Sequence, residues 1–385
     1  MSRLPQLAIV VSPRRAAEER SSVRRLATAL LSEGAGITLF EPRAARDADA
    51  TQPVPERPER RFELPRRTLY DARVPFWLKR ARVERLAQSC ERAMPDLVWC
   101  CGADGWPLAI ELAEALDRPV ALDFRCWDEL RGATKVVRNE RVVALVAPCE
   151  ALARVARGVV PEPLVRLVPL GVRVPDAEPA EDSSRASVIL VLTERGTGPA
   201  VTAALSAVKT ACERLPDMLA LVECDSAQHA QVWRTARSLG LLGRTTAVSR
   251  GALTSAAVEA CDLLLLPETR GGPRLEALIA LGRGVPVIAS GDPYADTLID
   301  GETAVVVPSG PGQARDWADA VSASIEHRDQ ALKLAARGRA LVLFRHRSSA
   351  AAEALLAVAR DVTQGGPLRI SPSLAAAPRQ VERDG

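Results

Sequence analysis

Short, almost uniformly apolar runs recur along the whole chain, and longer mixed segments separate them. A run without polar alternation is typical of a strand covered on both faces of a parallel sheet. We therefore expect strands in the first half at residues 7–11, 36–40, 95–101, 119–124 and 142–147, and in the second half at 188–192, 218–223, 245–248, 262–266 and 285–290. Residues 300–308 are expected to form a turn that leads into one further strand. Helical segments fall between them, for example at 22–32 and 313–361. This alternation predicts an α/β fold with doubly wound parallel sheets.

The chain is too long for a single hydrophobic core, so two domains are expected: it has 385 residues. A stretch rich in Pro and Ser separates the two series of strands and indicates a linker. The predicted parts are an N-terminal Rossmann-like domain (1–172), a linker (173–187), a C-terminal Rossmann-like domain (188–345), a helix (346–362) that could pack back toward the N-terminal domain, and a flexible tail (363–385). Residues 43–75, rich in Pro and Arg, are expected to form an exposed excursion with one short strand.

The composition fits a soluble globular protein and disfavours nucleic-acid binding. Hydrophobic residues make up 47% of the chain and charged residues 26%, which is an ordinary balance for a packed domain. Aromatic residues are only 3%, so platforms on which bases could stack are scarce. The net charge of +3 is small, and no basic cluster is interleaved with aromatic residues. We expect no nucleic-acid partner.

The cysteine spacing gives no sign of a metal centre. The eight cysteines are scattered apart from Cys100-Cys101, and no Cys-x2-Cys pair or zinc-type Cys/His spacing occurs. Free reduced thiols are the simplest interpretation. The apolar run at 7–11 is too short for a secretory signal or a membrane span, which predicts a cytoplasmic location.

A basic segment from Trp77 to Arg92 leaves a second possibility for the location. It carries Lys79, Arg80 and Arg82 next to apolar residues, which is compatible with weak, peripheral association with the inner face of a membrane. A solvated helical face with its apolar side packed on a sheet is the favoured interpretation, because runs of charge usually mark such faces.

The segment Glu268-Thr-Arg-Gly-Gly-Pro-Arg-Leu-Glu276 places two carboxylates around a Gly-Gly turn directly after an apolar run. Pro273 suits the first position of a helix, so Gly271 and Gly272 would form the strand-to-helix turn and Glu276 would lie in the first helical turn. Such a helix N-terminus offers free N–H groups and a partial positive charge to a phosphate, and carboxylates accept hydrogen bonds from sugar hydroxyls. The alternative is an ordinary crossover whose two glutamates are solvated.

The segments that follow make the motif more specific. A helix from Glu276 ends at Gly282 and Gly284, the strand at 285–290 comes next, and Asp300-Gly-Glu-Thr then forms a turn. In this order they resemble the C-terminal half of retaining GT-B glycosyltransferases of family 4, which have a Glu-x7-Glu motif, a Pro-Val-Val-Ala-Ser-like strand and an Asp-Gly-Glu-Thr-Gly-like turn. The resemblance implies two doubly wound Rossmann-like domains facing across a cleft. It also implies transfer of a sugar from a nucleotide-sugar donor to an unknown acceptor, which could be a glycan, a lipid-linked molecule or a small molecule, with retention of the anomeric configuration.

The resemblance also implies roles for individual residues. Glu268 is the catalytic candidate and would bind hydroxyls of the donor sugar, while Glu276 would bind the ribose. The implied donor-binding residues are Glu276, Gly271, Gly272, Leu275, Arg195 and Arg274. Backbone N–H groups near the two glycines and Leu275 would face the sugar and the phosphates, and Arg195 would offset the diphosphate charge. Such a site needs neither a metal ion nor a cofactor, which agrees with the absence of a credible Asp-x-Asp triplet.

Two departures from the family pattern leave activity open. Many members have glycines after the first strand and a His after the fourth, whereas this chain has Ser12-Pro-Arg-Arg and Trp99-Cys-Cys-Gly102 at those places. A catalytically inactive GT-B-like protein, acting as a binding or regulatory partner, therefore stays an alternative. A nucleotide-sugar epimerase of the same architecture would need a His/Asp/Glu set for its acid/base steps, and the sequence offers none.

Overall fold

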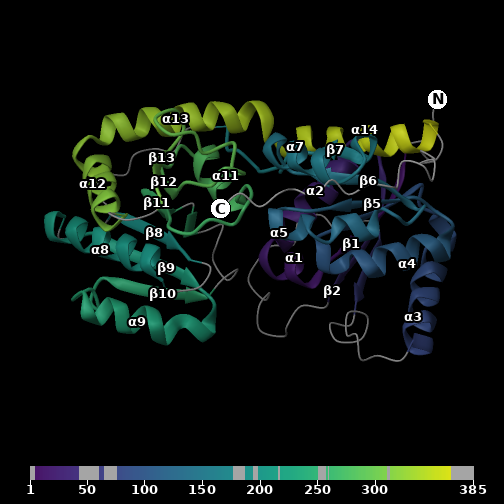
Figure 1. The fold of residues 1–385 in the computed structure, drawn as a ribbon, viewed down its shortest axis with the longest axis horizontal. Coiled ribbons are helices and arrows are strands. Elements are labelled where there is room, and N and C mark those ends of the chain that lie inside the picture. The colour runs from purple at the N-terminus through teal and green to yellow at the C-terminus, as the bar shows by residue number, and fades with distance from the viewer. Residues whose placement is uncertain are drawn as a thin grey trace. The chain divides into compact units, whose positions relative to one another are not determined.

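A computed structural model describes residues 5–42, 60–64, 76–176, 187–193, 198–215, 217–249, 257–258, 260–309 and 313–365. The chain divides into two compact units. The N-terminal unit comprises Met1–Pro169 together with Ser348–Gly385, and the C-terminal unit comprises Leu170–Arg347. Figure 1 shows each unit as a sheet flanked by helices, with the last helix, in yellow, placed on the unit that contains the purple N-terminal strands.

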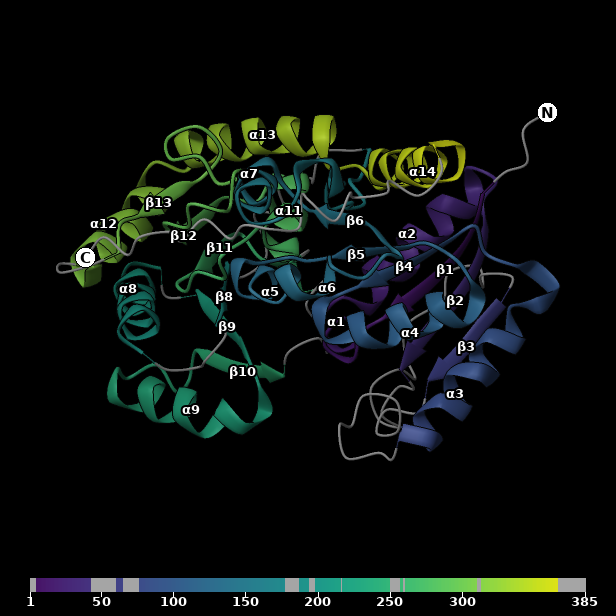
Figure 2. The ribbon, with the colours of Figure 1, turned by 45° about the vertical axis from the view of Figure 1, so that its right-hand side comes forward.

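The N-terminal unit is built on a parallel seven-stranded sheet with the order β3-β2-β1-β4-β5-β6-β7. Its strands are β1 (Gln6–Val11), β2 (Gly36–Pro42), β3 (Arg60–Leu64), β4 (Leu97–Cys101), β5 (Val120–Asp123), β6 (Val142–Ala147) and β7 (Val165–Leu167). Its described α-helices are α1 (Pro13–Glu18), α2 (Arg20–Ser32), α3 (Phe76–Ser89), α4 (Trp106–Leu116), α5 (Trp127–Leu130), α6 (Ala133–Val136), α7 (Glu150–Val159) and α14 (Ser348–Gly365). Figure 2 shows helices on both faces of this sheet.

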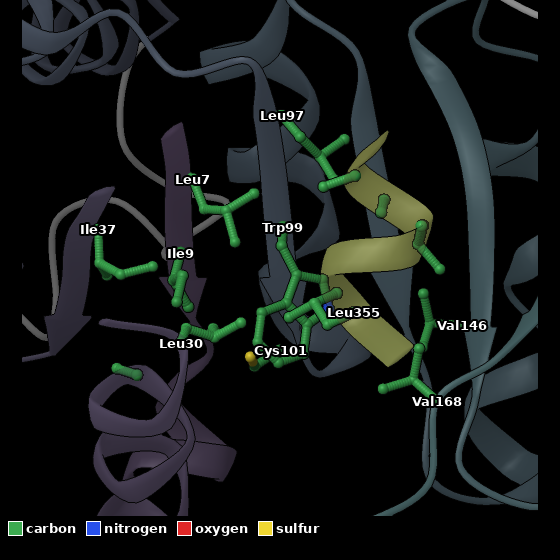
Figure 3. Packing of buried hydrophobic residues seen from close by; sticks show 14 of the residues in the cluster. Leu7, Ile9, Leu30, Ile37, Leu97, Trp99, Cys101, Val146, Val168 and Leu355 are labelled. Atoms are coloured by element: carbon green, nitrogen blue, oxygen red, sulfur yellow. The ribbon is translucent and has the colours of Figure 1, made fainter. Parts of the chain in front are cut away.

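One face of this sheet carries a core that joins the two ends of the chain. The cluster includes Leu7 and Ile9 of β1, Trp99 of β4 and Leu355 of α14, each at most 1% exposed. Figure 3 shows Leu355 approaching Trp99 from the yellow helix. Helix α14 also packs against α2, so the last described helix of the chain covers strands formed near its beginning.

The C-terminal unit repeats the same plan with a parallel six-stranded sheet in the order β10-β9-β8-β11-β12-β13. Its strands are β8 (Val188–Leu192), β9 (Leu219–Cys224), β10 (Thr245–Ser249), β11 (Leu263–Leu266), β12 (Val287–Ser290) and β13 (Val305–Val307). Its described helices include α8 (Pro199–Arg214), α9 (His229–Ser238), α11 (Leu275–Gly282), α12 (Gln313–Glu326) and α13 (Arg328–Arg345). Two apolar clusters are built on this sheet, and α8 and α12 contribute to one of them and α11 to the other.

The predicted fold class is confirmed, and most predicted strands coincide with observed ones to within about two residues. Burial explains this success, because the strands of both sheets are covered on both faces and leave nearly uniform apolar runs. The short strand expected within 43–75 is β3. The turn expected from Asp300 is present, since Gly301 adopts a positive φ of 68°, and it leads into β13 at Val305. Three predicted segments lie wholly or largely outside the described residues: the rest of the excursion (43–59 and 65–75), most of the linker, and the tail beyond 365.

Two helix boundaries differ from expectation. A helix was expected only from residue 22, but α1 begins at Pro13, directly after β1, with Ser12 as its N-cap. The Ser12 Oγ accepts a hydrogen bond from the Arg15 N–H at 3.2 Å, which is the usual way in which a serine starts a helix. The second helix, α11, begins at Leu275 and not at Pro273, because Arg274 keeps an extended backbone at φ −105° and ψ 128°.

The basic helix α3 pairs part of its charge with carboxylates of the same unit. Lys79 contacts Glu111 of α4, and Arg80 lies 3.0 Å from Glu84 one turn along α3. These pairs favour a helical face directed at other protein groups and solvent over a free basic surface.

Among the helices that the structure describes, none is both long and apolar enough to span a membrane.

Candidate functional site

The Glu-x7-Glu segment lies at the place where ligands bind in open α/β sheets. In the C-terminal sheet the strand order reverses between β8 and β11, which are neighbours although they are far apart in sequence. Ligands of such sheets bind outside the carboxyl ends of the strands at this switch point. Residue 193 follows β8 there, and the segment from Pro267 to Arg274 follows β11. The switch point is therefore formed by the motif and by the end of β8.

Glu268 is held across this switch point by Thr193. The Thr193 hydroxyl donates a hydrogen bond of 2.8 Å to the Glu268 Oε2. Thr193 is only 2% exposed, and its N–H donates to the Glu223 carbonyl at the end of β9. A partly buried carboxylate that is tied to a buried hydroxyl keeps a fixed direction at the carboxyl edge of the sheet.

The Gly-Gly turn is fixed by a residue that the sequence analysis did not single out. Successive N–H groups of Arg270, Gly271 and Gly272 donate to the Asp292 Oδ2, at 3.1, 2.8 and 3.3 Å. Gly271 has a φ of 69°, a region that glycine enters without steric cost. Below the turn, the Ser290 hydroxyl donates to the Pro267 carbonyl at 2.6 Å. Both contacts come from the end of β12, so the neighbouring strand determines the shape of the turn.

Helix α11 starts immediately after the clamped turn. Its N-cap is Arg274, whose side chain makes no capping hydrogen bond to the first helical turn. Arg274 is 5% exposed, so its side chain is buried and does not point to solvent. Glu276 lies in the first turn, as predicted, and its Oε2 is buried without a hydrogen-bond partner within the described part of the chain. An unfilled acceptor and a helix N-terminus that no side chain caps thus lie within one turn of each other.

The structure brings most of the sequence-predicted residues together. The residues that share this edge of the C-terminal sheet are Glu268, Gly271, Gly272, Arg274, Leu275 and Glu276. Arg195 lies outside the described residues. The additional residues are Thr193, Ser290 and Asp292, and each lies at or just beyond the carboxyl end of β8 or β12. Their position after apolar runs is the only local signal that could have pointed to them.

The switch point of the N-terminal sheet, between β1 and β4, is filled by a buried arginine. Arg15 is 3% exposed; its Nη1 lies 2.8 Å from Glu19 Oε1, and its Nη2 contacts both oxygens of Glu129 at 3.0 and 2.9 Å. Burial favours loss of the Arg15 proton, but Glu19, Glu129 and neighbouring carboxylates outweigh it and raise the pKa of Arg15 above its ordinary value. The guanidinium is therefore charged and paired with Glu19 and Glu129.

A second ion pair lies beside Arg15. Asp123, at the end of β5, is 2% exposed, accepts the Gly102 N–H at 3.0 Å and pairs with the Arg125 Nη2 at 2.9 Å. Burial raises the pKa of Asp123 although Arg125 and Arg15 oppose the shift, and burial likewise raises the pKa of Glu129 against the effect of Arg15. Gly102 has a φ of 99°, and a Cβ there would lie 2.5 Å from the Ser12 Oγ. Ser12 to Arg15 and Gly102 stand where many of the resembled glycosyltransferases have glycines and a His. In this chain, buried side chains fill the space around them.

The described residues include neither a reactive thiol pair nor a metal-binding cluster in addition to these two sites. None of the eight cysteines forms a disulfide, and burial raises the pKa of Cys100 and Cys101 well above the ordinary thiol value. Thiols with raised pKa values are poor nucleophiles and poor metal ligands. In the part of the chain that the structure covers, no group of three or more His, Cys, Asp or Glu side chains could hold a metal ion.

Comparison with known proteins identifies the architecture. No protein-family model matches the chain, and no curated protein sequence matches it. Solved structures do match: sucrose-phosphate synthase from Thermosynechococcus elongatus superposes with a TM-score of 0.72 at 18% identity, over 94% of this chain and 100% of that one. A glycosyltransferase from Rickettsia africae has a TM-score of 0.69 at 13% identity, over 95% and 100%. HepE from Anabaena, solved with UDP-glucose, has a TM-score of 0.67 at 13% identity, over 92% and 98%.

At these identities the comparisons establish the fold. The chain has the GT-B architecture of two Rossmann-like domains, which is the fold of the retaining glycosyltransferases that its motifs resemble. The fold that the motifs predicted is therefore confirmed over nearly the whole chain.

Proposed function

We propose that the chain binds a nucleotide-activated sugar at the switch point of its C-terminal unit and transfers that sugar, with retention of configuration, to an acceptor of unknown class. The observation that carries this proposal is the hydrogen bond of 2.8 Å from Thr193 to Glu268, which fixes a carboxylate beside the N-terminus of α11. HepE, one of the similar structures, was solved with UDP-glucose, and the pneumococcal transferase GtfA was solved with UDP and GlcNAc. A uridine nucleotide sugar is therefore the first donor to test.

Each residue of the site has a role that suits its position. Glu268 accepts hydrogen bonds from sugar hydroxyls, and Glu276 accepts them from the ribose through its unfilled Oε2. The first N–H groups and the partial positive charge of α11 face the diphosphate. Arg274 and Arg195 are the candidate cations that offset its charge. Gly271 and Gly272 contribute by leaving room for the ligand, since the side chain of Asp292 already accepts their N–H groups.

Transfer with retention requires no protein nucleophile. The bond between the anomeric carbon and the phosphate oxygen breaks, and its electron pair leaves with the nucleoside diphosphate. The acceptor oxygen forms its bond to the same face of that carbon, and its proton passes to the departing phosphate oxygen. The protein's contribution is to orient both partners and to stabilise the leaving charge. In this proposal neither a metal ion nor a cofactor takes these roles.

A second candidate function has its own supporting observation. The ion pairs of Arg15 and Asp123 fill the switch point of the N-terminal sheet, and no His follows β4. A protein that binds a nucleotide sugar without transferring it, and acts as a binding or regulatory partner, would retain the C-terminal site and need no open crevice in the N-terminal unit. Binding alone does not separate the two candidates, whereas turnover does.

The first experiment is a calorimetric titration of the full chain with UDP-glucose, other nucleotide sugars and free UDP. We expect saturable binding, and losses of about tenfold or more in Glu268→Ala and Glu276→Ala, because a hydrogen bond to a charged group contributes about 1.5–3 kcal/mol. Glu302→Ala removes an exposed carboxylate of the same unit and is the matched control. No binding of any nucleotide sugar, or unchanged affinity in both site variants, would refute the proposal.

Turnover is measured on the same samples. Release of UDP from the bound nucleotide sugar, with a panel of acceptors or with water, supports the transferase. Saturable binding without release of UDP under any acceptor condition supports the second candidate.

A further inference from the structure

We propose that Asp292 is a positioning residue of the candidate donor site: it clamps the Gly-Gly turn and thereby sets the position of Glu268 relative to the N-terminus of α11. This inference rests on the proposed function, since it concerns the same site. Asp292 does not belong to the Glu-x7-Glu motif; it lies just beyond the end of β12, the strand that neighbours β11.

The contacts of Asp292 are those of a clamp. Its Oδ2 accepts N–H groups from three successive residues, Arg270, Gly271 and Gly272, at 3.1, 2.8 and 3.3 Å. Its Oδ1 accepts the Tyr294 N–H at 3.0 Å, which fixes the carboxylate in its own loop. Hydrogen bonds to an ionised carboxylate are about twice as strong as neutral ones. Consecutive N–H groups that converge on one oxygen form a concave binding site for an anion, and here the anion belongs to the protein itself.

This arrangement divides the donor site into two halves. On one side, Glu268 is tied to Thr193 at the end of β8. On the other side, α11 begins at Leu275 with Glu276 in its first turn. The clamped turn is the short connection between the two, and a nucleotide sugar must contact both halves at once. Free nucleoside diphosphate contacts only the helix half, so it is far less sensitive to the position of Glu268.

The same contacts allow an opposite role, and the two roles predict opposite results. If Asp292 merely occupied an anion site that the donor uses, the ligand would have to displace it, and removing the carboxylate would strengthen binding of UDP and of UDP-glucose. If Asp292 positions the turn, removing it weakens binding of UDP-glucose in particular. The Oδ1 bond to Tyr294 favours the positioning role, because it ties the carboxylate to its own loop while Oδ2 holds the turn.

The clamp itself is tested without ligand, by hydrogen exchange of the backbone amides resolved to single residues in the full chain. Asp292→Ala should abolish the protection of residues 270–272, and Asp292→Asn should retain part of it, since an amide oxygen still accepts N–H groups. The matched control is Asp300→Ala, which removes a carboxylate that accepts the Val306 N–H at 2.9 Å in the same unit. It should change exchange near Val306 and leave 270–272 protected. Unchanged protection of 270–272 in Asp292→Ala would overturn the clamp.

The positioning role is tested by calorimetry with UDP-glucose and UDP as the two probes. In Asp292→Ala we expect the affinity for UDP-glucose to fall by about tenfold or more and that for UDP by less than about threefold, with Asp292→Asn in between. Equal losses for both probes, or a gain for either, would overturn the proposal. If the wild-type protein binds neither these two probes nor any other nucleotide sugar, the proposed function is refuted and, with it, the positioning role; the exchange data then decide only whether the clamp exists. If it binds another nucleotide sugar instead, that sugar and its free nucleoside diphosphate replace the two probes.

Discussion

His346 is a buried histidine whose ring ties together two segments that are far apart in sequence. It is 4% exposed, and its Nδ1–H donates to the Leu170 carbonyl at 3.0 Å; the tautomer follows from the partner, which can only accept. The His346 carbonyl accepts the Val172 N–H at 2.7 Å, and Val172 forms a β-bridge with Arg347. These segments are the ends of the C-terminal unit, where the chain enters it and leaves it. The ring therefore stabilises the unit at both of its chain boundaries.

Protonation of His346 should destabilise the protein in mild acid. Burial lowers the pKa of His346 below its ordinary value of 6.5, while the hydrogen bond to Leu170 and the charge of Asp296 partly oppose this shift. Between the lowered pKa and 6.5 the unfolded chain binds a proton that the folded chain does not, so stability is full above pH 6.5 and is lost as the pH falls through that interval. The slope from one such group is at most about 1.4 kcal/mol per pH unit.

Urea unfolding at several pH values measures this effect. His346→Gln should lower the stability at high pH and flatten its decline below about pH 6.5, since the titrating ring is gone. His327→Gln, which removes an exposed histidine of the same unit, is the control and should keep the wild-type decline. An identical pH dependence in wild type and His346→Gln would show that this ring does not cause the decline.

The switch points of the two sheets have similar β–α connections, but different side chains occupy them. After β8, the Thr193 hydroxyl binds Glu268, and after β11 a glycine turn leads into α11; these are the elements of the proposed donor site. After β1, helix α1 starts at once, and its Arg15 is enclosed by Glu19 and Glu129. Ion pairs as deeply buried as these depend on every partner, because a charge left alone in the interior is costly.

Removing Arg15 should therefore destabilise the N-terminal unit strongly. Arg15→Met keeps the volume of the side chain but leaves Glu19, Glu129 and Asp123 without their shared cation, and breaking a buried pair typically costs about 3–5 kcal/mol. Urea unfolding of Arg15→Met, Glu129→Gln and the double variant gives the coupling energy. We expect the double variant to be more stable than the sum of the single losses predicts. Additive losses would mean that Arg15 and Glu129 stabilise the unit independently.

The sequence predicted those features whose cause is local. Strands buried on both faces leave uniform apolar runs, and Gly271, Gly284 and Gly301 mark turns because each has a positive φ. Helix α1 was not predicted, because Pro13-Arg-Arg has the composition of a loop. The burial of Arg15 depends on its ion pair with Glu129, 114 positions away. The partners of the motif are equally distant: Thr193 is 75 positions from Glu268, and Asp292 is 21 from Gly271. Periodicity carries no information about contacts of this kind, which arise only when the sheet is assembled.

Across the whole chain, each unit has its own core, and the chain passes from one unit to the other twice. It leaves the N-terminal unit after Pro169 and returns to it at Ser348, where α14 begins. Helix α14 places Leu355 and Ala352 in the same apolar cluster as β1 and β4, both at 0% exposure. The last described helix is therefore part of the N-terminal core, whereas the proposed donor site belongs entirely to the C-terminal unit.

This division predicts that the stability of the N-terminal core and ligand binding at the C-terminal site can be changed separately. Leu355→Ala should destabilise the N-terminal unit by about 2–5 kcal/mol, the usual cost of such a cavity. Its affinity for UDP-glucose should stay within about twofold of wild type, since the proposed site loses no contact. Leu205→Ala, an equally buried change in the core of the C-terminal unit, is the matched variant. Calorimetric unfolding with and without UDP-glucose measures both quantities, because a ligand stabilises only the unit that binds it. If Leu355→Ala lost binding as completely as Glu268→Ala, the site would depend on the N-terminal unit, and the assignment to the C-terminal unit alone would be wrong.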